Sequence, residues 1–309
     1  MNQLTYTQAL TGFFLTAQAR KLSKHTIADY ANTLVKKFQP FLGHDMVVGA
    51  ITAKHIEAFL AAQTTVSKKT TLNYHTGLSA FWTWAVKEQL ADSNIVHTVQ
   101  PPKPELPDIQ PYNQQEVRAL LSALAQSREY RRPGKRTCAH AVPHAERNRA
   151  LILLLLDTGI RASELCGIRL HHLDKRNQRI FIFGKGSRER HVPFSARTGQ
   201  ALWRYLATRP QADLNEPLFL LQNGRPFQRF RLLDLLETIG NRAGVTGVTV
   251  HRFRHTCAIQ YIRNGGDPFT LQRLLGHSTM EMVKRYLALA QADIENVHRR
   301  VSPVENWAL

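Results

Sequence analysis

The run HRFRH places His251 and Arg254 three residues apart, so that on a helix the two side chains share one face. An arginine fork matches two phosphate oxygens and never loses its charge, while a neighbouring histidine exchanges a proton near neutral pH. The pair therefore suits phosphoryl transfer, which needs cations around the phosphorus. A solvated basic helix carries the same pattern, so this pair alone does not decide the function.

Other positions could supply the remaining parts of such a reaction. Arg161 follows a tight turn at a predicted helix start, where free N–H groups attract phosphate, and Glu164 could hold its side chain in place. Lys185 stands at the tip of a predicted hairpin, where its ammonium could protonate a leaving oxygen. His277 lies at the entrance of a predicted helix, and Tyr286 follows about two turns later. Taken singly, each of these is also typical of an ordinary turn, surface or core residue.

Two domains are predicted to position these residues. Residues 1–99 read as a small helical domain, residues 100–112 as a stiff proline-rich linker, and residues 113–309 as a second domain that carries every motif above. The fold class is mainly α with a small β-hairpin or sheet. Apolar periodicity and capping residues predict helices at 6–19, 26–41, 54–63, 70–88, 113–127, 149–157, 199–208, 229–243, 251–264, 268–275 and 279–292, with a short helix near 161 and strands at 179–183 and 188–194.

Charge points to the partner. The net charge is +18 and the isoelectric point is about 10.3, which favours an anionic partner and most of all nucleic acid. Residues 1–100 contribute only +4, so the remaining +14 falls on the second domain and the linker. The apolar run Leu151–Leu156 is too short to span a bilayer, and three cysteines cannot build a disulfide framework. We therefore expect a cytoplasmic protein that associates with the nucleoid when it is on DNA.

The order and joint spacing of the motifs resemble those of the tyrosine recombinase family, the lambda-type integrases and Xer recombinases. The motifs are TGIRASEL, GKGSRERHVP, HRFRH, LLGHS and KRYLAL, and together they are far more specific than any one of them. The segments LSKHTIADYANTL and SKKTTLNYHTGLSAFWTWAVKEQLADSNI resemble the family's helical DNA-clamping domain. Because no extra module precedes Thr7, the resemblance favours a simple Xer-like or transposon-type enzyme.

This resemblance implies a mechanism without metal, nucleotide or other cofactor. By position, Tyr286 would attack the scissile phosphorus and become joined to the 3′ phosphate, with release of a 5′ hydroxyl. Arg161 and Arg254 would clamp the non-bridging oxygens, Lys185 would protonate the leaving oxygen, and two histidines would handle protons and hydrogen bonds. The catalytic set implied by the resemblance is thus Arg161, Lys185, His251, Arg254, His277 and Tyr286, with Glu164 as the support of Arg161.

The resemblance also implies partners. Double-stranded DNA would be cut and rejoined for integration, transposition or dimer resolution by a homo-oligomer, a tetramer in the synaptic complex. Residues 293–309 would dock on a neighbouring protomer, and whether an accessory protein takes part stays open. Outside the active site, candidates for DNA contact are the polar residues at helix starts and beside the hairpin: Lys24, Lys68, Lys69, Asn73, His75, Arg188 and Arg190. The basic stretch Arg128–Arg149 is either a DNA-contacting insertion or a solvated loop.

Two alternatives compete with a recombinase, and metal binding is a separate question. A type IB topoisomerase shares much of this chemistry but would relax supercoils without site preference. A non-catalytic DNA-binding protein on the same scaffold would need a broken catalytic position, and the sequence has none. Zinc sites could be drawn through Cys138, His140 and His144 or through His251, His255 and Cys257, but neither group has paired C-x-x-C spacing, so no metal is expected.

Overall fold

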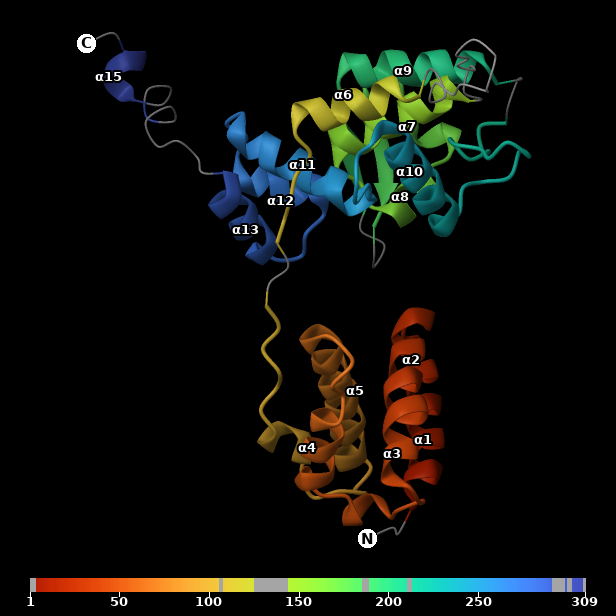
Figure 1. Ribbon diagram of the computed structural model, residues 1–309, viewed down its shortest axis with the longest axis vertical. Helices are drawn as coiled ribbons and strands as arrows, with labels where there is room; N and C mark the ends of the chain where they lie inside the picture. Colours follow the sequence, from red (N-terminus) through yellow and green to blue (C-terminus); the bar gives the residue numbers. More distant parts are fainter. Residues whose placement is uncertain are drawn as a thin grey trace, which may run out of the picture. The chain divides into compact units, whose positions relative to one another are not determined.

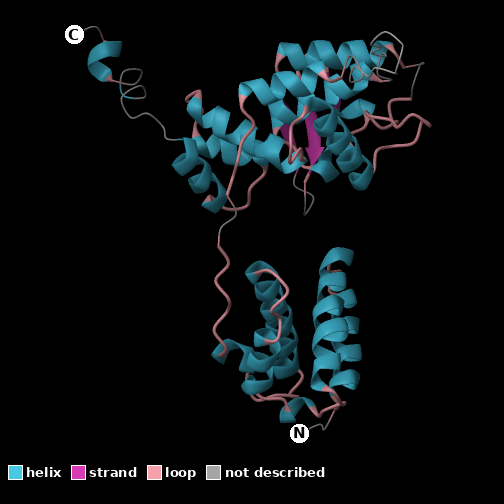
Figure 2. Cartoon of the chain, in the orientation of Figure 1, coloured by secondary structure: helices cyan, strands magenta, loops and turns pink. Residues whose placement is uncertain are grey.

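The computed structural model describes residues 4–105, 108–124, 144–184, 189–209, 213–290, 298 and 302–307. It contains two compact units, Met1–Asp108 and Ile109–Leu309, each described here by itself. Both units are dominated by helices, and the only sheet in the described residues is a small one in the second unit (Figure 2). The predicted fold class, mainly α with a small β element, is therefore confirmed.

The first unit is helical throughout (Figure 1). Several of its α-helices are capped by hydroxyl side chains, with Ser23 and Ser67 each accepting a hydrogen bond from a backbone N–H three residues on. The helical elements are α1 Tyr6–Ala19, α2 Lys24–Ala31, η1 Asn32–Phe38, α3 Gln39–Leu42, η2 Val48–Ala50, α4 Ala53–Ala61, α5 Lys68–Lys87 and η3 Ile95–Thr98. The predicted helix at 26–41 is present, but its middle, η1, is wound as a π-helix, which local propensity does not reveal.

Aromatic rings fill the core of this unit. Trp82 and Phe81 on α5 lie edge to face with centroids 5.0 Å apart, and both are fully buried. The ring centroid of Tyr6 on α1 lies 5.1 Å from that of Phe81, and the ring centroid of Phe38 lies 6.0 Å from that of Trp82. The apolar helix faces predicted from periodicity therefore meet in one aromatic cluster.

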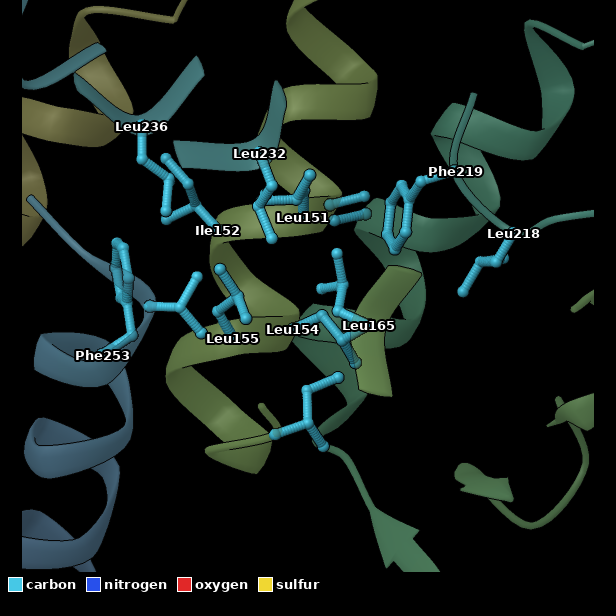
Figure 3. Packing of buried hydrophobic residues seen from close by; sticks show 14 of the residues in the cluster. Leu151, Ile152, Leu154, Leu155, Leu165, Leu218, Phe219, Leu232, Leu236 and Phe253 are labelled. Carbon is cyan, nitrogen blue, oxygen red and sulfur yellow. The ribbon is translucent and has the colours of Figure 1, made fainter. Parts of the chain in front are cut away.

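The second unit is built around a buried helix, α7 Ala145–Thr158. Figure 3 shows Leu151, Ile152, Leu154 and Leu155 of α7 packed among side chains from several other elements, including Phe253. Around it lie α6 Gln114–Ser122, α8 Ala162–Gly167, η4 Leu170–His172, α9 Ala196–Ala207, α10 Arg229–Ala243, α11 Val250–Arg263, α12 Pro268–Leu275 and α13 Glu281–Ala290; α15 Pro303–Asn306 follows near the C-terminus.

A three-stranded antiparallel sheet completes the unit, in the order β1-β2-β3. The predicted hairpin strands appear as β2 Arg179–Phe183 and β3 Glu189–Pro193, with Ile180 opposite Val192. The third strand, β1 Leu173–Asp174, is only two residues long, too short for the alternating pattern that identifies strands in a sequence. The tip of the hairpin, 185–188, lies outside the described residues.

Candidate active site

The end of α7 places Arg161. Gly159 caps the helix with a left-handed backbone, φ +59°, and a Cβ there would lie 2.7 Å from Leu275. Glycine is therefore required both by the turn and by the close approach of α12. The chain then reaches Arg161, which directly precedes α8.

Glu164 is the anchor of this corner of the site. Its carboxylate, 7% exposed, accepts from the Arg161 backbone N–H at 2.8 Å and from the Arg161 guanidinium at 2.9 Å. Arg190 of β3 donates to both carboxylate oxygens, at 2.9 and 3.0 Å. Burial alone would raise the pKa of Glu164, but the hydrogen bonds and charges of Arg190 and Arg161 outweigh burial and lower the pKa. Glu164 is thus a buried carboxylate held between two cations.

Arg254 occupies the interior. Only 4% exposed, it donates from Nη1 to the Gly159 carbonyl and from Nη2 to the Leu275 carbonyl, both at 2.8 Å. Nη2 also lies 2.6 Å from Nε2 of His277. Burial, reinforced by the charge of Arg161, lowers the pKa of Arg254 to about 10, which still leaves the guanidinium charged at neutral pH. The backbone carbonyls at two helix ends therefore fix the position of this cation.

His277 follows the C-cap glycine of α12. Gly276 has φ +65°, its carbonyl accepts from Arg161 Nη2 at 3.1 Å, and a Cβ there would meet the Arg190 guanidinium at 3.0 Å. Burial and the neighbouring arginines lower the pKa of His277 to about 4, so the ring is neutral at pH 7. Since Nε2 accepts from Arg254, the proton of the neutral ring is on Nδ1. That buried Nδ1 has no hydrogen-bond partner among the described residues.

Tyr286 brings a phenol to this cluster from α13. Its side chain is 1% exposed and packs with the apolar cluster of α11, α12 and α13. Its ring stacks on that of His277 with centroids 6.2 Å apart, and its hydroxyl lies 3.0 Å from Nδ1 of His255. Burial raises the pKa of Tyr286, while the nearby Arg254 opposes that rise. The phenol therefore stays protonated in the resting site.

His251 lies one turn before His255 on the same helix, and their ring centroids are 6.4 Å apart. Its side chain is exposed, unlike those of Arg254 and Tyr286. Partial desolvation, followed by the charge of Arg254, lowers the pKa of His251. His251 therefore lies at the accessible rim of the cluster.

The structure thus brings together six of the seven residues that the sequence assigned to the site or its support: Arg161, Glu164, His251, Arg254, His277 and Tyr286. The seventh, Lys185, lies outside the described residues. Two residues belong to the cluster although the sequence analysis did not place them there, His255 and Arg190. The last letter of the HRFRH motif was an available signal for His255, whereas nothing local to the hairpin reveals that Arg190 reaches back to α8.

The candidates for DNA contact divide into two groups. Lys24, Lys68, Lys69 and Asn73 are exposed in the first unit, and Lys68 forms a surface ion pair with Glu105 at 3.1 Å.

Arg190 and His75 differ from expectation, because both are held by the protein itself. Arg190 is committed to Glu164 and to the Leu274 carbonyl, and His75 is buried with Nε2 at 3.0 Å from the Val99 carbonyl. Arg188 and most of the basic stretch, residues 125–143, lie outside the described residues.

Within the described ranges, no group of three His, Cys, Asp or Glu side chains is arranged to hold a metal ion. In that same part of the chain, no helix is long and apolar enough to cross a membrane.

Comparison with known proteins agrees with this geometry. Residues 112–293 match the model of the phage integrase family. Tyrosine recombinase XerC of Staphylococcus carnosus (strain TM300) is 30% identical over 297 residues, covering 92% of this chain and 93% of that protein. XerC of Mycobacterium sp. (strain KMS) is 30% identical over 300 residues, covering 93% of this chain and 95% of that protein.

Solved structures show the same fold. The Tn1549 transposon integrase in complex with a circular intermediate DNA superposes with a TM-score of 0.72 at 19% identity, covering 93% of this chain and 99% of that one. A lambda integrase dimer bound to a COC′ core site gives 0.70 at 16% identity, covering 90% and 97%. Together with the family match and the full-length relatives, these findings show that the chain belongs to the phage integrase family and is a tyrosine-type, site-specific DNA recombinase.

Proposed function

We propose that Tyr286 is the nucleophile that cuts one DNA strand and carries its 3′ phosphate, while Arg161 and Arg254 hold the non-bridging phosphate oxygens. One observation carries this proposal. Side chains from four separate segments converge around one point, because Arg254 hydrogen-bonds His277, the His277 ring stacks on Tyr286, and Arg161 binds the carbonyl of Gly276.

Charge supports a phosphate at this point. Three guanidiniums, those of Arg161, Arg190 and Arg254, gather around the single carboxylate of Glu164, which leaves an excess of positive charge. The side chain of Arg161 is 36% exposed, so a ligand can reach it. The Nδ1–H of His277 is a buried donor that lacks an acceptor among the described residues. A phosphodiester would supply both the missing negative charge and the missing acceptor.

The leaving 5′ oxygen needs a proton, and Lys185 is its proposed source by its place in the motif order. His251 is proposed to contact the phosphate from the exposed rim of the site. In the reverse reaction the 5′ hydroxyl of a partner strand attacks the phosphotyrosine. The bond energy is kept in that link, so no nucleotide cofactor is needed.

The first unit is proposed as the DNA clamp. Its exposed Lys24, Lys68, Lys69 and Asn73 at helix starts and polar faces suit phosphate contacts. DNA is present in the Tn1549 and lambda integrase complexes named above, which supports DNA as the partner here. A homotetramer on two sites is proposed from the resemblance, with the exposed Trp307 in the tail that would reach a neighbour. The proposed substrate is the DNA of a mobile or chromosomal element, and the proposed location is the cytoplasm.

The decisive experiment is trapping of a covalent protein–DNA adduct. Binding sites are first selected from randomised duplexes with the full chain, and nicked suicide substrates are then built on the recovered sequences. The wild-type chain should form an adduct with a 3′ phosphate and release a 5′ hydroxyl. Tyr286→Phe should bind the same DNA and form no adduct, because only the phenol oxygen is lost.

Tyr261→Phe is the matched control, since Tyr261 is a part-exposed tyrosine of α11 in the same unit. It should form adduct at the wild-type rate. Persistence of the adduct in Tyr286→Phe would move the nucleophile elsewhere. Relaxation of plasmids without any selected site would favour the topoisomerase activity instead.

A further inference from the structure

Tyr286, the nucleophile proposed above, is hydrogen-bonded to a residue that is not among those proposed to hold the phosphate. Tyr286 on α13 and His255 on α11 meet through the phenol hydroxyl and Nδ1, 3.0 Å apart. Their ring centroids lie 5.7 Å apart. A buried hydroxyl of a 1% exposed tyrosine needs a hydrogen-bond partner, and in the described residues His255 provides it.

The direction of this hydrogen bond follows from the neighbours. Burial raises the pKa of Tyr286, and the positive charge of Arg254 opposes that rise. Since arginine has no acceptor atom, the hydroxyl proton must point to another group. The pKa of His255 is lowered to about 4, first by burial and then by His251, Arg254 and Arg285, so the ring is neutral at pH 7 and has one bare nitrogen. The consistent arrangement is a phenol O–H that donates to a bare Nδ1, with the ring proton on Nε2.

We infer that His255 is a catalytic residue whose Nδ1 takes the phenol proton of Tyr286 as the oxygen attacks phosphorus. The inference rests on Tyr286 being the nucleophile. It assigns the proton acceptor for the first half of the reaction, while Lys185 remains the proposed donor for the other half.

The step balances. The O–H bond of Tyr286 breaks and its proton binds Nδ1 of His255, which becomes an imidazolium. The electron pair left on the phenol oxygen forms the new O–P bond. The bond from phosphorus to the 5′ oxygen breaks, and that oxygen takes a proton from the Lys185 ammonium. When a 5′ hydroxyl attacks in reverse, Lys185 recovers a proton and His255 returns its own to the departing phenol oxygen.

The surroundings decide when the proton moves. Four neighbouring groups interact with the charge of a protonated His255. On α11 and α13, His251, Arg254 and Arg285 lower the pKa of His255, so they disfavour a cation there. The fourth group is His277, before α13, whose own pKa is lowered in part by His255. The proton therefore does not leave the resting phenol. It transfers while the O–P bond forms, because bonding to phosphorus makes the phenol more acidic and the bound phosphate offsets nearby positive charge.

The test compares two substrates. Cleavage by wild-type, His255→Ala, His255→Asn and Lys185→Ala chains is timed on the selected nicked duplex and on the same duplex with sulfur in place of the bridging 5′ oxygen. Sulfur leaves without a proton, so the sulfur substrate should restore cleavage by Lys185→Ala. It should not restore cleavage by a variant that lacks the acceptor for the phenol proton. His255→Ala should slow cleavage roughly 10²–10⁴-fold on both substrates relative to wild type.

His255→Asn separates positioning from proton transfer. Its amide oxygen can accept from the phenol near the Nδ1 position but is not a base, so its cleavage should stay at least roughly tenfold slow while DNA binding is kept. His191→Asn, an exposed histidine of β3, is the matched control and should cleave normally. A wild-type rate in His255→Ala, full rescue by asparagine, or rescue of His255→Ala by sulfur would each overturn the inference.

One measurement needs no DNA and is made on the wild-type chain. Nitrogen-15 spectra of histidine-labelled wild-type chain, assigned by the loss of a signal in His255→Asn or by through-bond experiments, report which ring nitrogen carries the proton. We expect a bare Nδ1 and a protonated Nε2 at pH 7, and a protonated Nδ1 would overturn the inference. Because this experiment does not require cleavage, it also separates failure of the inference from failure of the proposed nucleophile, which would appear as absence of any wild-type adduct.

Discussion

The two units are stabilised by different means. The first buries aromatic and aliphatic side chains, with Trp82 and Phe81 at its centre. The second has an equally apolar centre around α7 but also buries charged groups, Glu164 and Arg254 among them. Apolar burial stabilises a fold without any further requirement, whereas a buried charge costs free energy unless every partner is in place. The second unit therefore depends on a network of buried, hydrogen-bonded charges that the first does not need.

The largest effect should come from breaking that network at Glu164. Glu164→Gln removes the negative charge that both Arg161 and Arg190 contact, and leaves the largely buried Arg190 without its counter-charge. Breaking such a pair should lower the free energy of unfolding of the second unit by about 3–5 kcal/mol. Adduct formation should also slow at least roughly 100-fold, because Arg161 loses its support. Urea unfolding and suicide-substrate kinetics measure the two effects.

Glu237→Gln is the control, because Glu237 is exposed on α10 of the same unit. Its unfolding free energy should change by less than about 0.5 kcal/mol. Equal stability of the two variants would show that the charge of Glu164 is not needed to balance the arginines.

A comparable loss without any chemical effect is expected in the first unit. Trp82→Ala removes a fully buried ring from the aromatic cluster and should cost about 3–5 kcal/mol. Hydrogen exchange should show weaker protection in α5 and unchanged protection in α7. Leu15→Ala, at a side chain that is 63% exposed, should be nearly neutral. Parallel loss of protection in α7 would mean that the two units do not unfold independently.

Lowering the pH should increase the difference between the two units. The pKa of both His255 and His277 is lowered to about 4 by burial and nearby arginines, whereas an unfolded histidine titrates near ~6.5. Between those values the unfolded chain binds more protons, so the free energy of unfolding falls as pH falls. We expect the second unit to lose about 2–4 kcal/mol between pH 7 and 4, less than the full linkage value because the rings are only partly buried.

Chemical denaturation across this pH range measures the slope. The double variant His255→Asn, His277→Asn should flatten it, since neither side chain can bind a proton. An unchanged slope would place the acid sensitivity in other groups.

The smallest effect should be that of Tyr286→Phe on stability. The variant loses one hydroxyl and its hydrogen bond to His255, so the free energy of unfolding should change by about 0.5–1.5 kcal/mol. The ring remains packed against His277. A change in the free energy of unfolding within this range, together with complete loss of adduct, would show that chemistry and stability can be separated at this residue. A loss as large as that of Glu164→Gln would contradict it.

Much of the helical pattern could be read in advance. Helix α1 and helix α10 have the predicted bounds, because apolar spacing and capping residues are local signals. Helix α13 begins at Glu281, two residues after the predicted start, and the π-helical turn of η1 was not expected. Helix ends commonly shift by one or two residues, and a π-helical turn has no local sequence signal, so neither difference could be predicted from the sequence.

The amino-acid sequence alone determined the family, the helical character and the set of candidate residues for phosphoryl transfer. Only the tertiary structure decided that Arg190 crosses from β3 to Glu164 and that His255, rather than His251, is hydrogen-bonded to the hydroxyl of Tyr286. The physical reason is that ion pairing, burial and the pKa of a buried group depend on atoms distant in the chain. Spacing in a sequence can predict which side chains share a helix face, but it carries no measure of the distance between two helices or of the water excluded between them.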